Sequence, residues 1–231
     1  THETDPSVVI QSIDVHRTFR VDGREVLALR GANFFVNKGE YVALMGRSGS
    51  GKTTLLNIMG GLDRTTSGQM ILFGQDLGSL PDEELTQLRR TRIGFVFQQF
   101  ALMPTLSAEE NVDLPLRMIG MNRKERRQRV AECLEIVNLS DRAKHRPQEL
   151  SGGQQQRVAI ARAISAHPGL ILADEPTGEL DSTSGRTVMK TFANICETLG
   201  ITVVMTSHDP VVQEFANYTY HMEDGMILNE R

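Results

Sequence analysis

The 231-residue sequence has few cysteines, no tryptophan and no long hydrophobic run. Its two cysteines, Cys133 and Cys196, lie too far apart for a metal-binding motif, and a reducing compartment is expected. Each is predicted to be a small buried residue on the apolar face of a helix. No stretch reaches the roughly 18 apolar residues of a membrane-spanning helix. The longest uncharged run, residues 93–108, contains two glutamines, a proline and a threonine.

The sequence also lacks a large excess of charge of either sign. Its 25 Lys and Arg against 29 Asp and Glu give a net charge of −4, which argues against nucleic acid as a partner. One basic cluster has Glu125, Glu132 and Glu135 interleaved with it, which predicts a solvated helix face. The cluster comprises Arg123, Lys124, Arg126, Arg127 and Arg129. The first seven residues are polar and acidic and do not resemble a signal peptide.

Apolar segments are nevertheless numerous enough for a sizeable core, since 39% of the residues are hydrophobic. Three segments, residues 41–45, 170–173 and 201–206, are continuously apolar, which is typical of strands buried on both faces of a parallel sheet. Further strands are predicted at residues 8–15, 26–29, 33–36, 70–73, 93–97, 218–222 and 226–228.

Helical patterns alternate with these strands. Helices are predicted at residues 52–60 and near Thr187. Residues 104–166 are rich in charged residues and have a helical pattern. Within this stretch Val130, Cys133, Leu134 and Val137 recur at helical spacing. The pattern indicates a helical subdomain inserted into an α/β core.

A glycine-rich loop follows the first continuously apolar strand and precedes a helix. Its glycines allow successive backbone N–H groups to surround an anion, and the helix N-terminus adds partial positive charge. Lys52 would contact the β- and γ-phosphates, and the Thr53 hydroxyl suits Mg²⁺. The pattern predicts a nucleotide site. It comprises Gly46, Arg47, Ser48, Gly49, Ser50, Gly51, Lys52 and Thr53, with Thr54 next in the helix.

Two acids, Asp174 and Glu175, end another continuously apolar strand. A carboxylate at this position beside the phosphate loop can hold Mg²⁺, and a second one can act as general base toward water. Without the phosphate loop, these two acids would indicate only a solvated strand end. The presence of the loop favours the catalytic interpretation.

A third motif, Ser151, Gly152, Gly153 and Gln154, precedes a helical stretch. Ser151 and Gln154 are spaced as a capping box. A capped N-terminus with two glycines also leaves N–H groups free to face an anion. The phosphate loop would meet this helix only if a second surface approached it, and the motif alone does not say whether that surface belongs to the same chain.

The order of these three motifs resembles the ATP-binding subunit of an ABC transporter, over essentially the whole chain. By this resemblance Phe19 stacks on adenine, although a strand-edge core residue is the alternative. Gln98 links Mg²⁺ and the γ-phosphate region to a membrane partner. Asp181 signals across a dimer, and His208 contacts the γ-phosphate.

Residues 45–63 and 151–163 resemble one branch of that family, the lipoprotein-release and macrolide-export ATPases. Two positions depart from the family pattern. Arg47 replaces a common proline, and Glu179 stands where asparagine is usual. Neither is a catalytic position.

The resemblance implies one ABC domain over residues 1–231, with a P-loop NTPase α/β fold. Residues 1–97 and 167–231 form a parallel-sheet core with an N-terminal antiparallel β subdomain, and residues 98–166 form the helical signature subdomain.

The resemblance further implies two copies that close around two Mg-ATP molecules, each between Lys52 of one copy and Ser151 of the other. Glu175, His208 and Gln98 would be catalytic, and Thr53, Gln98 and Asp174 would hold Mg²⁺. A separately encoded membrane permease, docked near Gln98, implies a location on the cytoplasmic face of the membrane. The remaining nucleotide contacts would be the phosphate loop, Phe19, Asp181 and the signature residues Ser151, Gly152, Gly153 and Gln154.

Other functions fit the sequence less well. An ABC ATPase of DNA repair would carry long coiled coils or zinc modules, and one of translation would carry two such domains. The signature motif argues against a P-loop kinase, and the missing Asn-Lys-x-Asp motif argues against a GTPase. An inactive nucleotide-binding regulator is disfavoured because every expected catalytic position is filled.

Overall fold

The computed structural model describes residues 7–229, so most of the acidic start of the chain lies outside the described part. Its larger sheet has the strand order β10-β9-β3-β8-β7-β6. All neighbours pair in parallel except the short β10, which is antiparallel to β9. The strands are β3 (Tyr41–Met45), β6 (Ile93–Phe97), β7 (Leu170–Asp174), β8 (Thr202–Ser207), β9 (Tyr218–Glu223) and β10 (Met226–Ile227).

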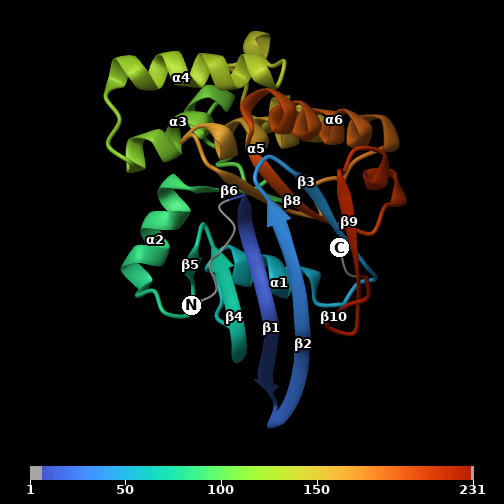
Figure 1. Ribbon diagram of the computed structural model, residues 1–231. Helices are drawn as coiled ribbons and strands as arrows, with labels where there is room; N and C mark the ends of the chain where they lie inside the picture. The colour runs from blue at the N-terminus through green and yellow to red at the C-terminus, as the bar shows by residue number, and fades with distance from the viewer. Residues whose placement is uncertain (1–6, 230–231) are drawn as a thin grey trace.

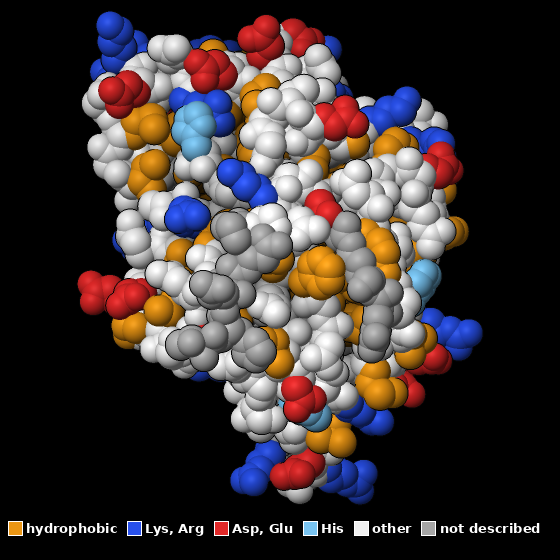
Figure 2. Space-filling view, in the orientation of Figure 1, with side chains coloured by type: hydrophobic (Ala, Val, Ile, Leu, Met, Phe, Trp, Pro, Cys, Tyr) orange, Lys and Arg blue, Asp and Glu red, His pale blue; other side chains and the backbone are white. Residues whose placement is uncertain are grey.

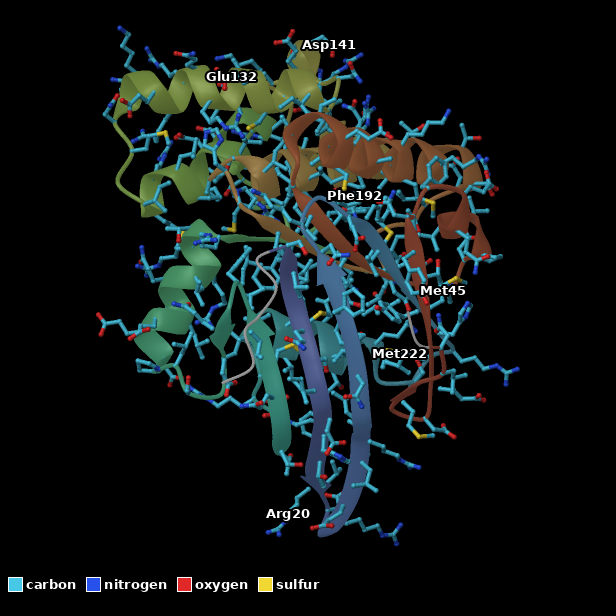
Figure 3. All side chains as sticks on the ribbon, in the orientation of Figure 1. Arg20, Met45, Glu132, Asp141, Phe192 and Met222 are labelled. Atoms are coloured by element: carbon cyan, nitrogen blue, oxygen red, sulfur yellow. The ribbon has the colours of Figure 1, made fainter. Side chains whose placement is uncertain are left out.

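A smaller antiparallel sheet has the order β2-β1-β4-β5. It comprises β1 (Val8–Val21), β2 (Arg24–Asn37), β4 (Ser67–Leu72) and β5 (Gln75–Asp76). The long β1–β2 hairpin extends away from the helices at the top of the view (Figure 1), and Arg20 lies at its tip (Figure 3).

The described residues contain six α-helices: α1 (Lys52–Met59), α2 (Asp82–Thr91), α3 (Ala108–Met118), α4 (Arg123–Ile136), α5 (Gly152–Ile164) and α6 (Ser182–Leu199). Short 3-10 turns occur at Ser140–Arg142, Pro147–Glu149 and Pro210–Glu214. The segment predicted to be helical contains α3, α4 and α5. Within residues 7–229 no helix combines the length and apolarity needed to cross a bilayer. The expected α/β fold with a parallel sheet is confirmed.

Two hydrophobic cores lie on opposite faces of the larger sheet, and β3 supplies both because its side chains alternate. Tyr41 and Ala43 pack with α3–α6, whereas Val42 and Leu44 pack with α1 and the smaller sheet. Phe192 of α6 lies over the first face (Figure 3). Because both faces of β3 are covered, its residues form the continuous apolar run seen in the sequence.

The structure differs from the predicted elements in the smaller sheet. Residues 26–29 and 33–36, expected as two strands, belong to the single strand β2. Gly31 between them has φ +86°, and a Cβ there would lie 2.9 Å from Asp14 Oδ1, so this glycine allows an irregularity without ending the strand. Strand β1, expected to end at residue 15, continues to Val21 because β2 pairs with it to the hairpin tip.

The basic cluster on α4 is only partly a solvated face. Arg123, Lys124 and Arg127 are exposed as predicted, but Arg129 is buried and donates hydrogen bonds to the carbonyls of Ile164 and Ser165. On the face shown in Figure 2, the described basic and acidic side chains are interspersed, with no continuous patch of one sign.

The two cysteines are buried, as predicted, in α4 and α6. Burial raises the pKa of both the Cys133 and the Cys196 thiols to about 11. Both thiols are therefore protonated and uncharged at neutral pH, so the two cysteines behave as small apolar residues.

Candidate functional site

The glycine-rich loop connects the end of β3 to the start of α1. Gly51, at the N-cap of α1, has φ +101°, and a Cβ there would lie 2.6 Å from the carbonyl oxygen of Ala28. Only glycine therefore fits between the loop and β2. No side chain caps the helix, so its first N–H groups are available to an anion.

Lys52 and Ser50 give this loop polar groups that face inward. The Lys52 side chain is buried, and its Nζ donates to the carbonyls of Gly46 and Arg47 at 2.8 and 3.0 Å. The buried hydroxyl of Ser50 has no hydrogen-bond partner within residues 7–229. A buried polar atom without a partner is unfavourable, so the loop is built to receive a polar ligand.

A cavity of about 300 Å³ opens above the loop. Its lining includes the apolar segment Val26–Ala28 of β2 and Glu175. Phe19 does not line the cavity, but it pairs directly with Val26, so the two side chains share one face of the sheet. The remaining lining residues are Ser48, Gly49, Gly51, Lys52, Thr53 and Thr54.

Asp174 and Glu175 lie where β7 ends beside this loop. Asp174 Oδ1 accepts hydrogen bonds from Thr53 Oγ1 at 3.2 Å and from Thr206 Oγ1 at 2.7 Å. The Glu175 backbone N–H donates to the same Thr206 hydroxyl at 2.9 Å. Sequence reasoning missed Thr206, a fully buried residue of β8. No local sequence signal identifies it, because its position opposite Asp174 is set by the β7–β8 register.

The Glu175 carboxylate lies between two cationic or ionisable groups. Its Oε1 is 3.5 Å from Lys52 Nζ, and its Oε2 is 3.0 Å from His208 Nδ1. Glu175 has φ +42°, a conformation that non-glycine residues rarely adopt. The structure therefore brings together the phosphate-loop lysine, both acids and the histidine that the sequence singled out.

Gln98 is not joined to that group. Its Nε2 donates to Glu179 Oε1 at 3.1 Å, and no hydrogen bond links it to Thr53 or Asp174 among the described residues. A Cβ on Gly178 would lie 3.0 Å from the same nitrogen. Glu179, which departs from the family pattern, is thus the partner of Gln98 in this arrangement.

Ser151 begins α5 with the predicted capping box. Its Oγ accepts from the Gln154 N–H, while Gln154 Oε1 accepts from the Ser151 N–H at 2.9 Å. A Cβ on Gly153 would lie 3.0 Å from Ser184 Cβ, so this glycine allows α5 to approach α6 closely. Among the described residues that line the 300 Å³ cavity, none belongs to the signature.

Asp181 has a local structural role at the start of α6. Its carboxylate accepts from the N–H groups of Thr183 and Ser184, each at 3.0 Å. The hydrogen bonds with Ser184 are the main cause that holds the pKa of Asp181 below its usual value. It is therefore a charged N-cap at neutral pH.

A protein-family model described as "ABC transporter" matches residues 29–178, more than half of the chain. The chain belongs to the ABC transporter ATP-binding family. It is an ATPase subunit of that family whose cofactors are ATP and Mg²⁺, and the resemblance drawn from its motifs is confirmed.

Relatives of this ABC ATPase include transporter subunits of the expected branch. It is 46% identical over 226 residues to an uncharacterised ABC transporter ATP-binding protein of Methanocaldococcus jannaschii, MJ0796, and covers 96% of each chain. It is 44% identical over 224 residues to the macrolide export ATP-binding/permease protein MacB of Syntrophobacter fumaroxidans, covering 96% of this chain but 31% of MacB. These relatives support a transporter subunit and give no support to the DNA-repair or translation alternative.

Solved structures agree with this assignment. A dimeric post-hydrolysis structure of MJ0796 bound to ADP and Pi matches the ABC ATPase with a TM-score of 0.87 and 44% identity, covering 95% of this chain and 97% of that one. CbiO1 of Clostridium perfringens, part of the transporter complex cbiONQ, matches with a TM-score of 0.89 and 26% identity, covering 96% and 88%.

The residues of the ATPase site fit Mg-ATP. The partnerless Ser50 hydroxyl, the glycine-lined loop and the Lys52 ammonium suit phosphate oxygens. Thr53 and Asp174 offer the oxygen ligands that Mg²⁺ prefers. Within the described chain no three His, Cys, Asp or Glu side chains gather as a metal cage. Mg²⁺ characteristically uses one or two protein ligands together with substrate phosphates and water, so this donor set suffices.

Proposed function

We propose that this ABC ATPase binds Mg-ATP between its phosphate loop and the signature helix of a second copy, and that hydrolysis powers a membrane permease. The observation that carries the proposal is that, within the described residues, the signature contributes nothing to the phosphate-loop cavity. The 300 Å³ cavity holds the phosphate loop and Glu175, whereas the capped N-terminus of α5, with exposed Ser151, contributes nothing to it. The dimeric MJ0796 structures support closure between two copies.

In the proposed mechanism the chain's own side chains take distinct roles. Phe19 would stack on the adenine beyond Val26, and Lys52 would exchange its carbonyl partners for the β- and γ-phosphates. Thr53 and Asp174, already hydrogen-bonded to each other, would hold Mg²⁺, with Gln98 joining them after leaving Glu179. When bound, Mg²⁺ neutralises negative charge on the phosphate oxygens.

Glu175 is proposed as the general base and His208 as the group that orients the γ-phosphate. Once the triphosphate attracts Lys52, the Glu175 carboxylate would be free to accept a proton from the attacking water. His208 Nδ1 already donates to the Glu175 carboxylate, so the same pair can position both the base and the phosphate. Asp181, an exposed N-cap beside the signature, would contact the second copy.

A groove of about 530 Å³ offers a docking site for the permease. It lies between α2, β6, α3 and α5, and it exposes the apolar side chains of Leu62, Phe97 and Met118. We propose that a short cytoplasmic helix of the permease occupies it, which would place the chain on the cytoplasmic face of the membrane. The MacB relatives, which are named as combined ATP-binding/permease proteins, support this partner.

Phosphate release by the purified chain tests the proposed activity. We expect Mg²⁺-dependent ATP hydrolysis whose rate rises more than linearly with protein concentration, because two copies form each site. DNA duplex and ribosomes, added in parallel, should leave the rate unchanged. A rate strictly proportional to protein concentration, without detectable association, would contradict the shared site. Stimulation by DNA or ribosomes would instead favour the alternative without a transport role.

A further inference from the structure

The loop that follows Gln98 is held by hydrogen bonds from Arg162 of α5. Residues 98–107 join β6 to α3, and Phe100 and Ala101 adopt left-handed backbone conformations, with φ of +59° and +50°. Non-glycine residues keep such conformations only where the surroundings hold them. Here Arg162 of α5 donates from Nη1 to the Ala101 carbonyl at 2.6 Å and from Nη2 to the Phe100 carbonyl at 3.2 Å.

Gln156, two turns earlier on α5, binds the two segments that flank the catalytic centre. Its side chain is fully buried, and Nε2 donates to the carbonyls of Phe97 at 3.2 Å and Pro176 at 2.6 Å. Phe97 directly precedes Gln98, and Pro176 directly follows Glu175. Its Oε1 has no partner among residues 7–229. One α5 side chain therefore fixes the spacing between these two segments.

The far end of the loop is also fastened by a helix. Asn111 of α3 is fully buried; its Oδ1 accepts from the Met103 N–H at 2.8 Å, and its Nδ2 contacts the carbonyls of Met103, Leu106 and Ser107 at 3.0–3.2 Å. Figure 1 shows α3 and α5 in the same helical layer, above the sheets. Among described residues, the side-chain hydrogen bonds to the backbone of residues 97–107 all come from these two helices.

Within the described chain, Gln98 is the one residue of this loop whose side chain hydrogen-bonds to a segment other than α3 and α5, namely to Glu179. The ring of Phe100 approaches the signature, since a Cβ on Gly152 would lie 3.6 Å from its Cζ. The loop is thus attached to the helix whose N-terminus carries Ser151, and it begins where β6, the edge strand of the larger sheet, ends.

We propose that Arg162, supported by Gln156, is a positioning residue that holds residues 99–107 on the signature helix, so that this loop and the Gln98 backbone move with that helix as one unit. This inference rests on the proposed function. Displacement of the signature helix by the second copy then moves the Gln98 backbone directly, without rearrangement of the loop. Because Arg162 also lines the 530 Å³ groove, a permease segment there would contact the same guanidinium.

The test compares Arg162→Lys with Arg129→Lys. Both arginines donate to two backbone carbonyls, but Arg129 binds Ile164 and Ser165, next to Arg162 at the C-terminal end of α5, and makes no hydrogen bond to the described loop residues. An ammonium group cannot reproduce the forked guanidinium, so both variants lose hydrogen bonds. Hydrogen exchange of the nucleotide-free protein reports on the loop, and ATP titration of hydrolysis gives kcat and KM.

In Arg162→Lys we expect amide exchange at residues 100–102 to accelerate about tenfold or more, since bonds from charged donors contribute enough to shift an opening equilibrium by that factor. kcat should fall several-fold with KM for ATP unchanged. Arg129→Lys should show neither effect, even if its Tm is lower.

Gln156→Met, which keeps the side-chain volume but removes the donor, should reproduce the fall in kcat if Arg162→Lys does not fold. Loop exchange that rises equally in both arginine variants would overturn the proposal, as would wild-type kcat in Arg162→Lys. The exchange result does not depend on hydrolysis. A wild-type protein without ATPase activity would therefore refute the proposed function separately.

Discussion

Lys52 and Glu175 face each other at the end of the nucleotide cavity, with Nζ 3.5 Å from Oε1. The two residues follow different parallel strands, since β3 leads into the phosphate loop before Lys52 and β7 ends at Asp174, directly before Glu175. The carboxyl ends of parallel strands meet at one edge of a sheet, which is why an open α/β sheet binds ligands there. The lysine that would bind phosphate is therefore paired with the base that would act on water.

Removal of the Lys52 charge should abolish tight ATP binding. In Lys52→Ala the phosphate loop loses its buried cation, while its backbone N–H groups remain. We expect Kd for Mg-ATP, measured by isothermal titration calorimetry, to rise by about 100-fold, because a charge-assisted contact in a secluded site contributes roughly 3 kcal/mol. Lys190→Ala, an exposed position on α6, is the matched control and should bind as the wild type does. Near-normal affinity in Lys52→Ala would exclude the site assignment.

Much of this site follows from the sequence because its parts are short and contiguous. Residues 46–53 form one loop with the first turn of α1, and Asp174 and Glu175 lie at the end of one strand, so local patterns suffice to identify them. Strands β3 and β6 have the bounds that were predicted, since buried runs begin and end sharply at turn residues. The capping box of Ser151 is equally local, and the structure contains it.

Features that depend on distant partners could not be predicted. Helix α2 buries only Leu85, so it lacks the apolar stripe that identifies a helix in a sequence. Gly31 resembles a strand break until Asp14 is seen opposite it. Thr206 and Arg162 look like an ordinary strand residue and an ordinary helix residue, because their functions are fixed by register and by loop carbonyls.

Glu175→Gln should separate hydrolysis from binding. The amide keeps the shape but cannot accept the proton, so we expect hydrolysis to fall by about 10²–10⁴, the usual contribution of a general base. ATP should still bind, because the phosphate loop is unchanged. The variant should then accumulate as a dimer with Mg-ATP, as measured by size exclusion with light scattering.

Ser151→Arg is expected to give the opposite result, no dimer, when it is measured by size exclusion with light scattering. ATP should bind its monomer, but the larger side chain at the N-terminus of α5 would block the second surface, and neither dimer nor hydrolysis should appear. Normal hydrolysis by Ser151→Arg would mean that the signature only caps α5 and takes no part in a nucleotide site. A Glu175→Gln protein that stays monomeric at saturating ATP would count against closure by the chain alone.

Phe19 is expected to bind the base through one face of its ring. The Arg17 guanidinium lies 4.3 Å from the ring centroid and is itself held by two hydrogen bonds to Asp63, which leaves the other face for adenine. Phe19→Ala should weaken ATP binding by about 1–3 kcal/mol, as base–aromatic stacking does, whereas Phe19→Tyr should be nearly silent. If Phe19→Ala lowers Tm without nucleotide and leaves Kd unchanged, the residue belongs to the core instead.

Thr206 should affect catalysis although it contacts no ligand, because its hydroxyl donates to Asp174 and accepts from the Glu175 N–H. Thr206→Val keeps the volume and leaves both groups without that partner, which should lower the free energy of unfolding by about 1–3 kcal/mol. kcat should fall about tenfold, since small displacements of positioned groups reduce rates strongly. Thr206→Ser should restore it.

The matched control for Thr206→Val is Thr202→Val, at the other end of the same strand. Thr202 is also fully buried, and its hydroxyl accepts from the Gly39 N–H at 2.9 Å, far along β8 from the two acids. Both valine variants should therefore lose stability, as measured by urea unfolding, but only Thr206→Val should lose kcat. Equal kcat in the two variants at matched stability would mean that Thr206 merely supports the strand. A selective loss, restored by Thr206→Ser, would mean that the hydroxyl positions Asp174 and Glu175 for hydrolysis.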